Sequence, residues 1–72
     1  MEFPVTIERE TDGRWIAAVD SLPGVQVYGA TEAEAIAKVQ GLALSVVADE
    51  IAHGDRDART LLSLRFTLGN AA

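Results

Sequence analysis

The chain contains no cysteine. This absence excludes disulfide bonds, thiolate metal sites and cysteine nucleophiles together, and it is compatible with a reducing compartment. Basic residues are also few, because 6 lysines and arginines stand against 11 acidic residues and give a net charge of -5. A surface that neutralises nucleic-acid phosphates is therefore not expected, whereas a basic protein partner would suit this charge.

Long apolar runs and a leader segment are missing as well. No stretch approaches the roughly 20 apolar residues of a membrane-spanning helix, and the N-terminus carries a glutamate and a proline instead of a basic segment and an apolar run. We therefore expect a cytoplasmic protein with no membrane association. Its 72 residues predict a single domain over 1–72. Domains of this size are marginally stable alone, and oligomerisation is a common source of added stability.

Alternating apolar and polar residues predict three strands in the first half of the chain. The first covers 3–9, the second 14–20 and the third 25–29. Thr11-Asp12-Gly13 supplies a hairpin turn between the first two, and Leu22-Pro23-Gly24 turns the chain into the third. The second strand is apolar on both faces, which is typical of a strand inside a sheet.

A long helix follows the third strand. Thr31 and Glu34 form a capping box at its start, and His53-Gly54 is its next stop signal. Helical spacing places the following apolar residues on one arc: Ala35, Ile36, Val39, Leu42, Ala43, Val46, Val47 and Ile51. This arc is wider than one sheet face requires, so part of it should meet a second surface. Gly41 lies mid-helix, where the absence of a side chain would permit close approach of another backbone.

Residues 60–68 resume the alternation and predict a fourth strand, with Leu62, Leu64, Phe66 and Leu68 facing inward. A strand-helix-strand crossover places this strand parallel to an earlier one. We therefore predict an α+β fold of order β-β-β-α-β, with a four-stranded mixed sheet in the order 3-2-1-4 and one long helix on one face. The topology is similar to part of the ribonuclease H fold.

The sheet face away from the helix is predicted to remain partly apolar. It would carry Thr6, Ile16, Ala18, Tyr28 and Leu61, with no second helix to cover it. Contiguous exposed apolar patches mark association sites. We therefore predict a homodimer or a higher homo-oligomer, with Ile16, Ala18, Tyr28 and Gly41 as candidate self-association residues.

Candidate chemistry centres on His53, the single histidine. Glu50-x-x-His53 has the spacing of di-iron carboxylate sites, and Asp49, Asp55 and Asp57 lie nearby, but such sites draw further ligands from other helices. A serine triad would need His53 with Ser21, Ser45 or Ser63, and no Gly-x-Ser-x-Gly elbow is present. We expect no catalytic, cofactor-binding or metal-binding residues; an enzyme or metal protein using Glu50 and His53 is the alternative.

Direct nucleic-acid binding is also not expected. The arginines are interleaved with acidic residues and form no basic stripe with exposed aromatics. The ribonuclease H fold acts through metal-bound carboxylates, but the inward positions of the first strand here are Phe3, Val5 and Ile7.

An ordered set of short motifs resembles the HicB-like antitoxin family over roughly residues 3–50. The motifs are Phe3-Pro4-Val5-Thr6-Ile7-Glu8, Asp12-Gly13, Trp15-Ile16-Ala17, Leu22-Pro23-Gly24, Gly29 and Thr31-x-x-Glu34-Ala35. The resemblance implies a non-catalytic antitoxin of a type II toxin-antitoxin pair, which binds and occludes a HicA-type mRNA-cleaving toxin with a basic RNA-binding surface. An acidic surface would suit that partner, and Glu8, Glu10, Asp12 and Asp20 are the candidate contacts.

The sequence departs from this family at its C-terminal end. Many such antitoxins carry a C-terminal DNA-binding segment, whereas only Gly69-Asn70-Ala71-Ala72 follows the predicted fourth strand. Operator binding is therefore not expected of this chain. Stand-alone versions of the domain resemble it equally well, so a solitary oligomeric binding module without a toxin partner is the alternative function.

Overall fold

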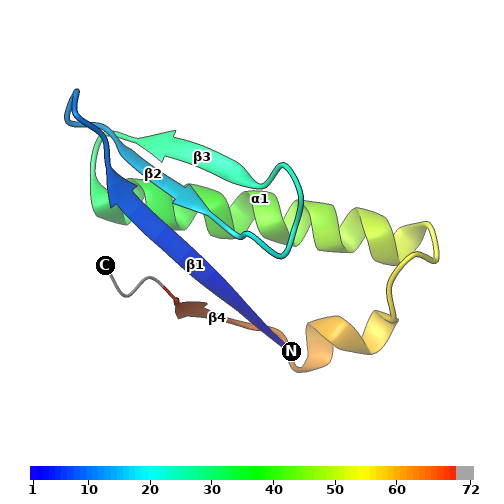
Figure 1. Ribbon diagram of the computed structural model, residues 1–72. Helices are drawn as coiled ribbons and strands as arrows, with labels where there is room; N and C mark the ends of the chain where they lie inside the picture. The colour runs from blue at the N-terminus through cyan, green and yellow to red at the C-terminus, as the bar shows by residue number, and fades with distance from the viewer. Residues whose placement is uncertain (70–72) are drawn as a thin grey trace.

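The computed structural model describes residues 1–69 and has the predicted architecture. Its elements in chain order are β1 (Glu2–Arg9), β2 (Trp15–Ala18), β3 (Gln26–Gly29), α1 (Glu32–Ala52), the 3-10 helix η1 (Ala58–Leu62) and β4 (Arg65–Leu68). The strands form a four-stranded sheet in the order β3-β2-β1-β4, and α1 lies along one face of it (Figure 1). The α+β class and the strand order predicted from the sequence are confirmed.

Strand β1 is central and pairs with both of its neighbours at different points along its length. It is antiparallel to β2 from Thr6↔Ala18 onward and parallel to β4 from Glu2↔Arg65 onward. Pro4 is the third residue of β1 and pairs only with β4, opposite Thr67. The missing N–H of proline is tolerated because the pairing with β2 has not yet begun at this residue.

The core lies between α1 and the sheet. Phe3 and Val5 of β1 and Ala17 of β2 meet the helix, which contributes small and branched side chains every four residues. The buried core residues are Phe3, Val5, Ala17, Val19, Leu22, Val25, Ala35, Val39, Ala43 and Val47. The helix packs mainly over β3 and β2, less over β1, and leaves β4 at the edge of the covered area.

Both ends of α1 are capped as the sequence predicts. The hydroxyl of Thr31 accepts a hydrogen bond from the Glu34 N–H at 3.1 Å. The Glu34 carboxylate reaches back to the N–H of Ala30 at 3.1 Å, one residue earlier than in the usual capping box. At the other end, Gly54 adopts a φ of 77°, the left-handed conformation that ends many helices. Over residues 1–69, no helix has the length and apolar character to cross a membrane.

The prediction of a strand over the whole of residues 60–68 is wrong in its first part. This part is not a strand, because Asp57 caps the 3-10 helix η1 through a hydrogen bond from the Arg59 N–H at 2.8 Å. Leu62 was predicted to face inward but lies on η1 and is 85% exposed. Leu68 shares a sheet face with the core residue Val5, yet it is 65% exposed because α1 does not cover β4.

Candidate functional site

The sheet face opposite α1, here called the open face, is built by strand register. Thr6, Ala18 and Gln26 lie side by side across β1, β2 and β3. Glu8, Ile16 and Tyr28 form the next row in the same way. Because side chains alternate along a strand, both rows point to the same side of the sheet.

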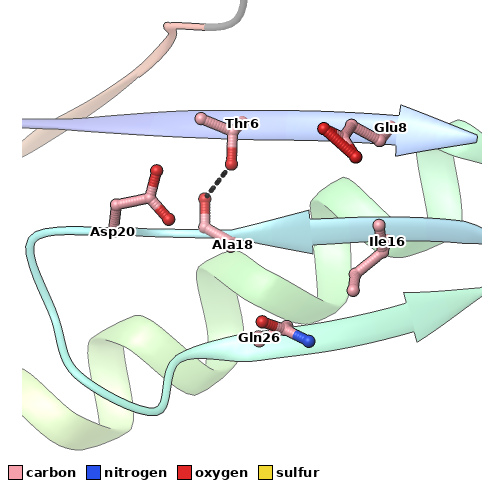
Figure 2. A pocket seen from close by; sticks show the side chains of 6 residues that line it. All are labelled: Thr6, Glu8, Ile16, Ala18, Asp20 and Gln26. Atoms are coloured by element: carbon pink, nitrogen blue, oxygen red, sulfur yellow. Dashed lines mark hydrogen bonds between the residues drawn. The ribbon is translucent and has the colours of Figure 1, made fainter.

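A shallow hollow of about 300 Å³ lies on this face. Figure 2 shows the six side chains that line it: Thr6, Glu8, Ile16, Ala18, Asp20 and Gln26. Ala18 is the central residue of the middle strand in this area, and its short side chain leaves room between the longer ones. The Thr6 hydroxyl donates to the Ala18 carbonyl at 3.5 Å, which fixes one edge of the hollow. The hollow is thus a depression on the sheet that is open to solvent.

Two carboxylates give this hollow its charge. Glu8 and Asp20 are both exposed, and within the described part of the chain neither forms an ion pair. Most other acidic side chains here have a cationic neighbour: Glu50 receives a hydrogen bond from Arg56 Nε at 2.7 Å. The hollow therefore offers two negative charges that the molecule itself does not neutralise.

The other two predicted contacts lie elsewhere. Glu10 and Asp12 belong to the β1–β2 hairpin and do not line the hollow. Asp12 holds the turn, since its carboxylate accepts from the Arg14 N–H at 3.0 Å and from Arg14 Nε at 2.7 Å. The hydrogen bond from the Arg14 N–H is the main reason that the pKa of Asp12 is lowered. Asp12 is thus engaged within its own loop.

The residues predicted for self-association are also divided. Ile16 and Ala18 line the hollow together with the acidic side chains. Tyr28 is adjacent on β3, and the Arg14 guanidinium lies 4.2 Å from its ring centroid. Gly41 is exposed on α1, and a Cβ added there would meet nothing within 4 Å. The structure therefore brings Ile16, Ala18 and Tyr28 together and leaves Gly41 on a different element.

Glu50 and His53, which an enzyme or a metal protein would use, each contact a different group of the chain. His53 Nδ1 lies 2.8 Å from the Asp49 carbonyl oxygen, and the Glu50 carboxylate is held by Arg56. Ser63 lies beside the amino group of Met1. Among residues 1–69, no three acidic or histidine side chains are grouped so that they could hold a metal ion.

Gln26 is the one lining residue that sequence reasoning did not single out. The alternation of residues 25–29 puts it on the polar side of β3, but its place in the hollow depends on the Ala18↔Gln26 register. That register follows from where the Leu22-Pro23-Gly24 turn ends, which composition alone does not specify.

The comparisons with known proteins add no identification. No family model, no curated protein and no solved structure matches the chain.

Proposed function

We propose that this protein is a non-catalytic, HicB-like antitoxin of the cytoplasm. In this proposal it binds a HicA-type mRNA-cleaving toxin through the open face of its sheet and covers the basic RNA-binding surface of that toxin. The observation that carries the proposal is the pair of carboxylates on the hollow, Glu8 and Asp20, which lack ion-pair partners within residues 1–69.

The chemistry of the hollow favours a cationic side chain as its occupant. Two carboxylates and the side-chain amide of Gln26 supply hydrogen-bond acceptors around a depression of about 300 Å³. Arginine matches such acceptors well because its planar guanidinium presents five donors in a fixed arrangement. Ile16 and Ala18 add apolar surface for the methylene groups of an inserted arginine or lysine.

The position of most of these groups on strands also supports binding. The lining residues of β1, β2 and β3 have backbones held by the sheet ladder, so little ordering is needed there when a partner docks, and Asp20 lies in the turn that follows β2. Complementary charge speeds encounter and restricts the choice of partner. An acidic surface of this kind suits occlusion of a basic protein.

The proposal is tested with a HicA-type toxin, ideally one encoded beside this chain, by co-purification and by rescue of cell growth. The double variant Glu8→Gln with Asp20→Asn should weaken the complex about tenfold at low salt, because two exposed ion pairs of modest strength are lost. The wild-type complex should weaken as salt is added, and that of the variant should weaken less.

Asp55 provides the matched control. It is exposed, makes no ion pair in the described part of the chain and follows the C-terminal end of α1, away from the hollow. Asp55→Asn should leave the affinity within about twofold of the wild type. Equal losses for Asp55→Asn and for the open-face variant would contradict docking at the hollow. Failure to bind any HicA-type toxin would instead contradict the antitoxin function itself.

A further inference from the structure

We infer that two copies of this chain associate through the outer edge of β4, with the two β4 strands antiparallel about a twofold axis at Thr67. The result would be one continuous eight-stranded sheet. This inference concerns an edge of the molecule that the antitoxin proposal does not use, and it does not depend on that proposal.

The hydrogen-bonding groups of β4 point in two directions. Arg65 N–H donates to the Met1 carbonyl at 3.0 Å, and Gly69 N–H donates to the Val5 carbonyl at 2.9 Å. Odd-numbered residues of β4 therefore pair with β1, and the backbone groups of Phe66 and Leu68 face the outer edge. No strand of residues 1–69 pairs along that edge, because β4 ends the sheet. Such an edge is a ready template for another strand.

Exposed apolar side chains lie on β4 and on the segment that leads into it. Leu68 is 65% exposed on the α1 side of β4, and Leu61 and Leu62 of the preceding η1 are 48% and 85% exposed. Figure 1 shows β4 at the margin of the sheet, beyond the part that α1 lies over. On the other edge strand, β3, the helix packs against the inner face of the strand. Pairing at β4 would thus cover Leu68, which the single chain leaves largely in water.

The sequence of β4 is complementary to itself in this arrangement. With the axis at Thr67, Phe66 of one copy lies opposite Leu68 of the other, and the two residues share the α1 side of the sheet. Thr67 lies opposite its own counterpart on the open face, a favourable cross-strand pair. Arg65 lies opposite Gly69, so no like charges face each other across the strands. Because each residue of β4 lies opposite a compatible residue, the partner that we infer for this edge is a second copy of the same chain.

Charge favours this edge over the open face as the site of self-association. Arg59 and Arg65 are the two charged residues of 58–69, and each forms an ion pair within its own chain, with Asp57 and Glu2. Contact between two open faces would instead bring together Glu8 and Asp20 of both copies, at the cost of like-charge repulsion. Self-association at β4 leaves the hollow free for a partner.

The association is tested by sedimentation equilibrium on the full chain and on two lysine variants. Wild type should be dimeric at micromolar concentration, and Leu68→Lys should raise the dissociation constant at least about tenfold, because a charge blocks the edge. Leu44→Lys is the matched control, since Leu44 is 41% exposed on α1, and it should remain dimeric. Circular dichroism checks that both variants fold.

A cross-link tests the proposed register between the two β4 strands. Because the chain has no cysteine, Thr67→Cys introduces a single thiol, and two such thiols would meet across the twofold axis at disulfide distance. Mild oxidation should give a covalent dimer in high yield, whereas Gln26→Cys on the open face should give little. A monomeric wild type would overturn the inference. So would efficient cross-linking of Gln26→Cys alone, or a Leu68→Lys variant that dimerises as tightly as wild type.

Discussion

Single side chains decide where the elements of this small fold begin. Thr31 ends the extended segment and accepts the N–H of Glu34, while Glu34 accepts the N–H of Ala30. These bonds satisfy donors that would otherwise be unpaired at the helix start. The site where α1 begins is therefore set by side-chain chemistry within residues 30–34.

A substitution at Thr31 tests this cap. Thr31→Ala should lower the free energy of unfolding by about 0.5 to 2 kcal/mol, because the hydroxyl that accepts the Glu34 N–H is lost. In a domain of this size the melting temperature should fall by about 4 to 8 °C for each kcal/mol. Thr31→Ser keeps the hydroxyl and should stay close to wild type. An unchanged melting temperature for Thr31→Ala would mean that the cap does not stabilise the helix.

The same Asp-x-Arg arrangement occurs at two turns. Asp12 accepts the N–H and the Nε–H of Arg14, and Asp57 does the same with Arg59. Each aspartate thus binds its own backbone two residues on, as in an Asx turn. The second example begins η1, and it explains why the chain after α1 forms a 3-10 helix before β4.

At the scale of elements, glycine positions show how closely α1 approaches the sheet. Gly29 ends β3 and is buried, and a Cβ placed there would lie 2.6 Å from Ala35 N and 2.9 Å from Ala35 Cα. The first turn of α1 can pack on β3 because residue 29 has no side chain. Gly41, by contrast, faces open space.

Two alanine substitutions separate these roles. Gly29→Ala should destabilise the fold by about 1 to 3 kcal/mol, since backbone atoms of the helix must move. Gly41→Ala should stabilise it by about 0.5 to 1 kcal/mol, because alanine is the better helix former and nothing obstructs its Cβ. Chemical denaturation measures both. A destabilised Gly41→Ala variant would show that another backbone packs against this part of α1.

How far the sequence predicts the structure differs between elements. Alternation, turn residues and the capping box were sufficient for β1, β2, β3 and α1, because each signal is local and agrees with its neighbours. At residues 60–64 the alternation of apolar residues predicted a strand, and this prediction was wrong. The cap by Asp57 begins η1 there and leaves Leu62 exposed. The side of the sheet on which Glu8 lies was predictable, but its proximity to Asp20 and Gln26 depends on register between strands.

For the whole molecule, charge links stability to pH. The pKa of each of four exposed carboxylates is lowered from its ordinary value of 4.5 for glutamate or 3.8 for aspartate. Hydrogen bonds are the main cause: from Arg65 to Glu2, from the Arg14 N–H to Asp12, from the Ala30 N–H to Glu34 and from Arg59 to Asp57. The folded state thus prefers the charged forms.

The stabilisation by these four carboxylates is present at neutral pH and lost in acid. Above about pH 5 these groups are ionised in both states and their interactions stabilise the fold; as pH falls below the ordinary values, the unfolded state takes up protons first and the stabilisation is lost. The melting temperature should therefore be nearly constant from about pH 8 to 5 and fall below about pH 4.5.

Amide variants test this account by thermal melts across pH. A variant with the four carboxylates changed to amides should melt lower at neutral pH and approach wild type in acid. The matched control changes Glu8, Glu10, Asp20 and Asp55 instead, which removes the same charge from residues without ion pairs in the described chain. It should retain the acid decline of wild type, and a control that also loses this decline would contradict the assignment.

The pairing of β1 with β4 joins segments more than fifty residues apart, whereas β1, β2 and β3 are joined by short turns. Bringing distant segments together costs more chain entropy than closing a hairpin. We therefore expect β1, β2, β3 and α1 to assemble early and β4 to dock late in folding. The amide hydrogens of β4 should accordingly exchange with solvent through local opening. Those of β1, β2 and β3 that are hydrogen-bonded within the sheet should exchange only on global unfolding.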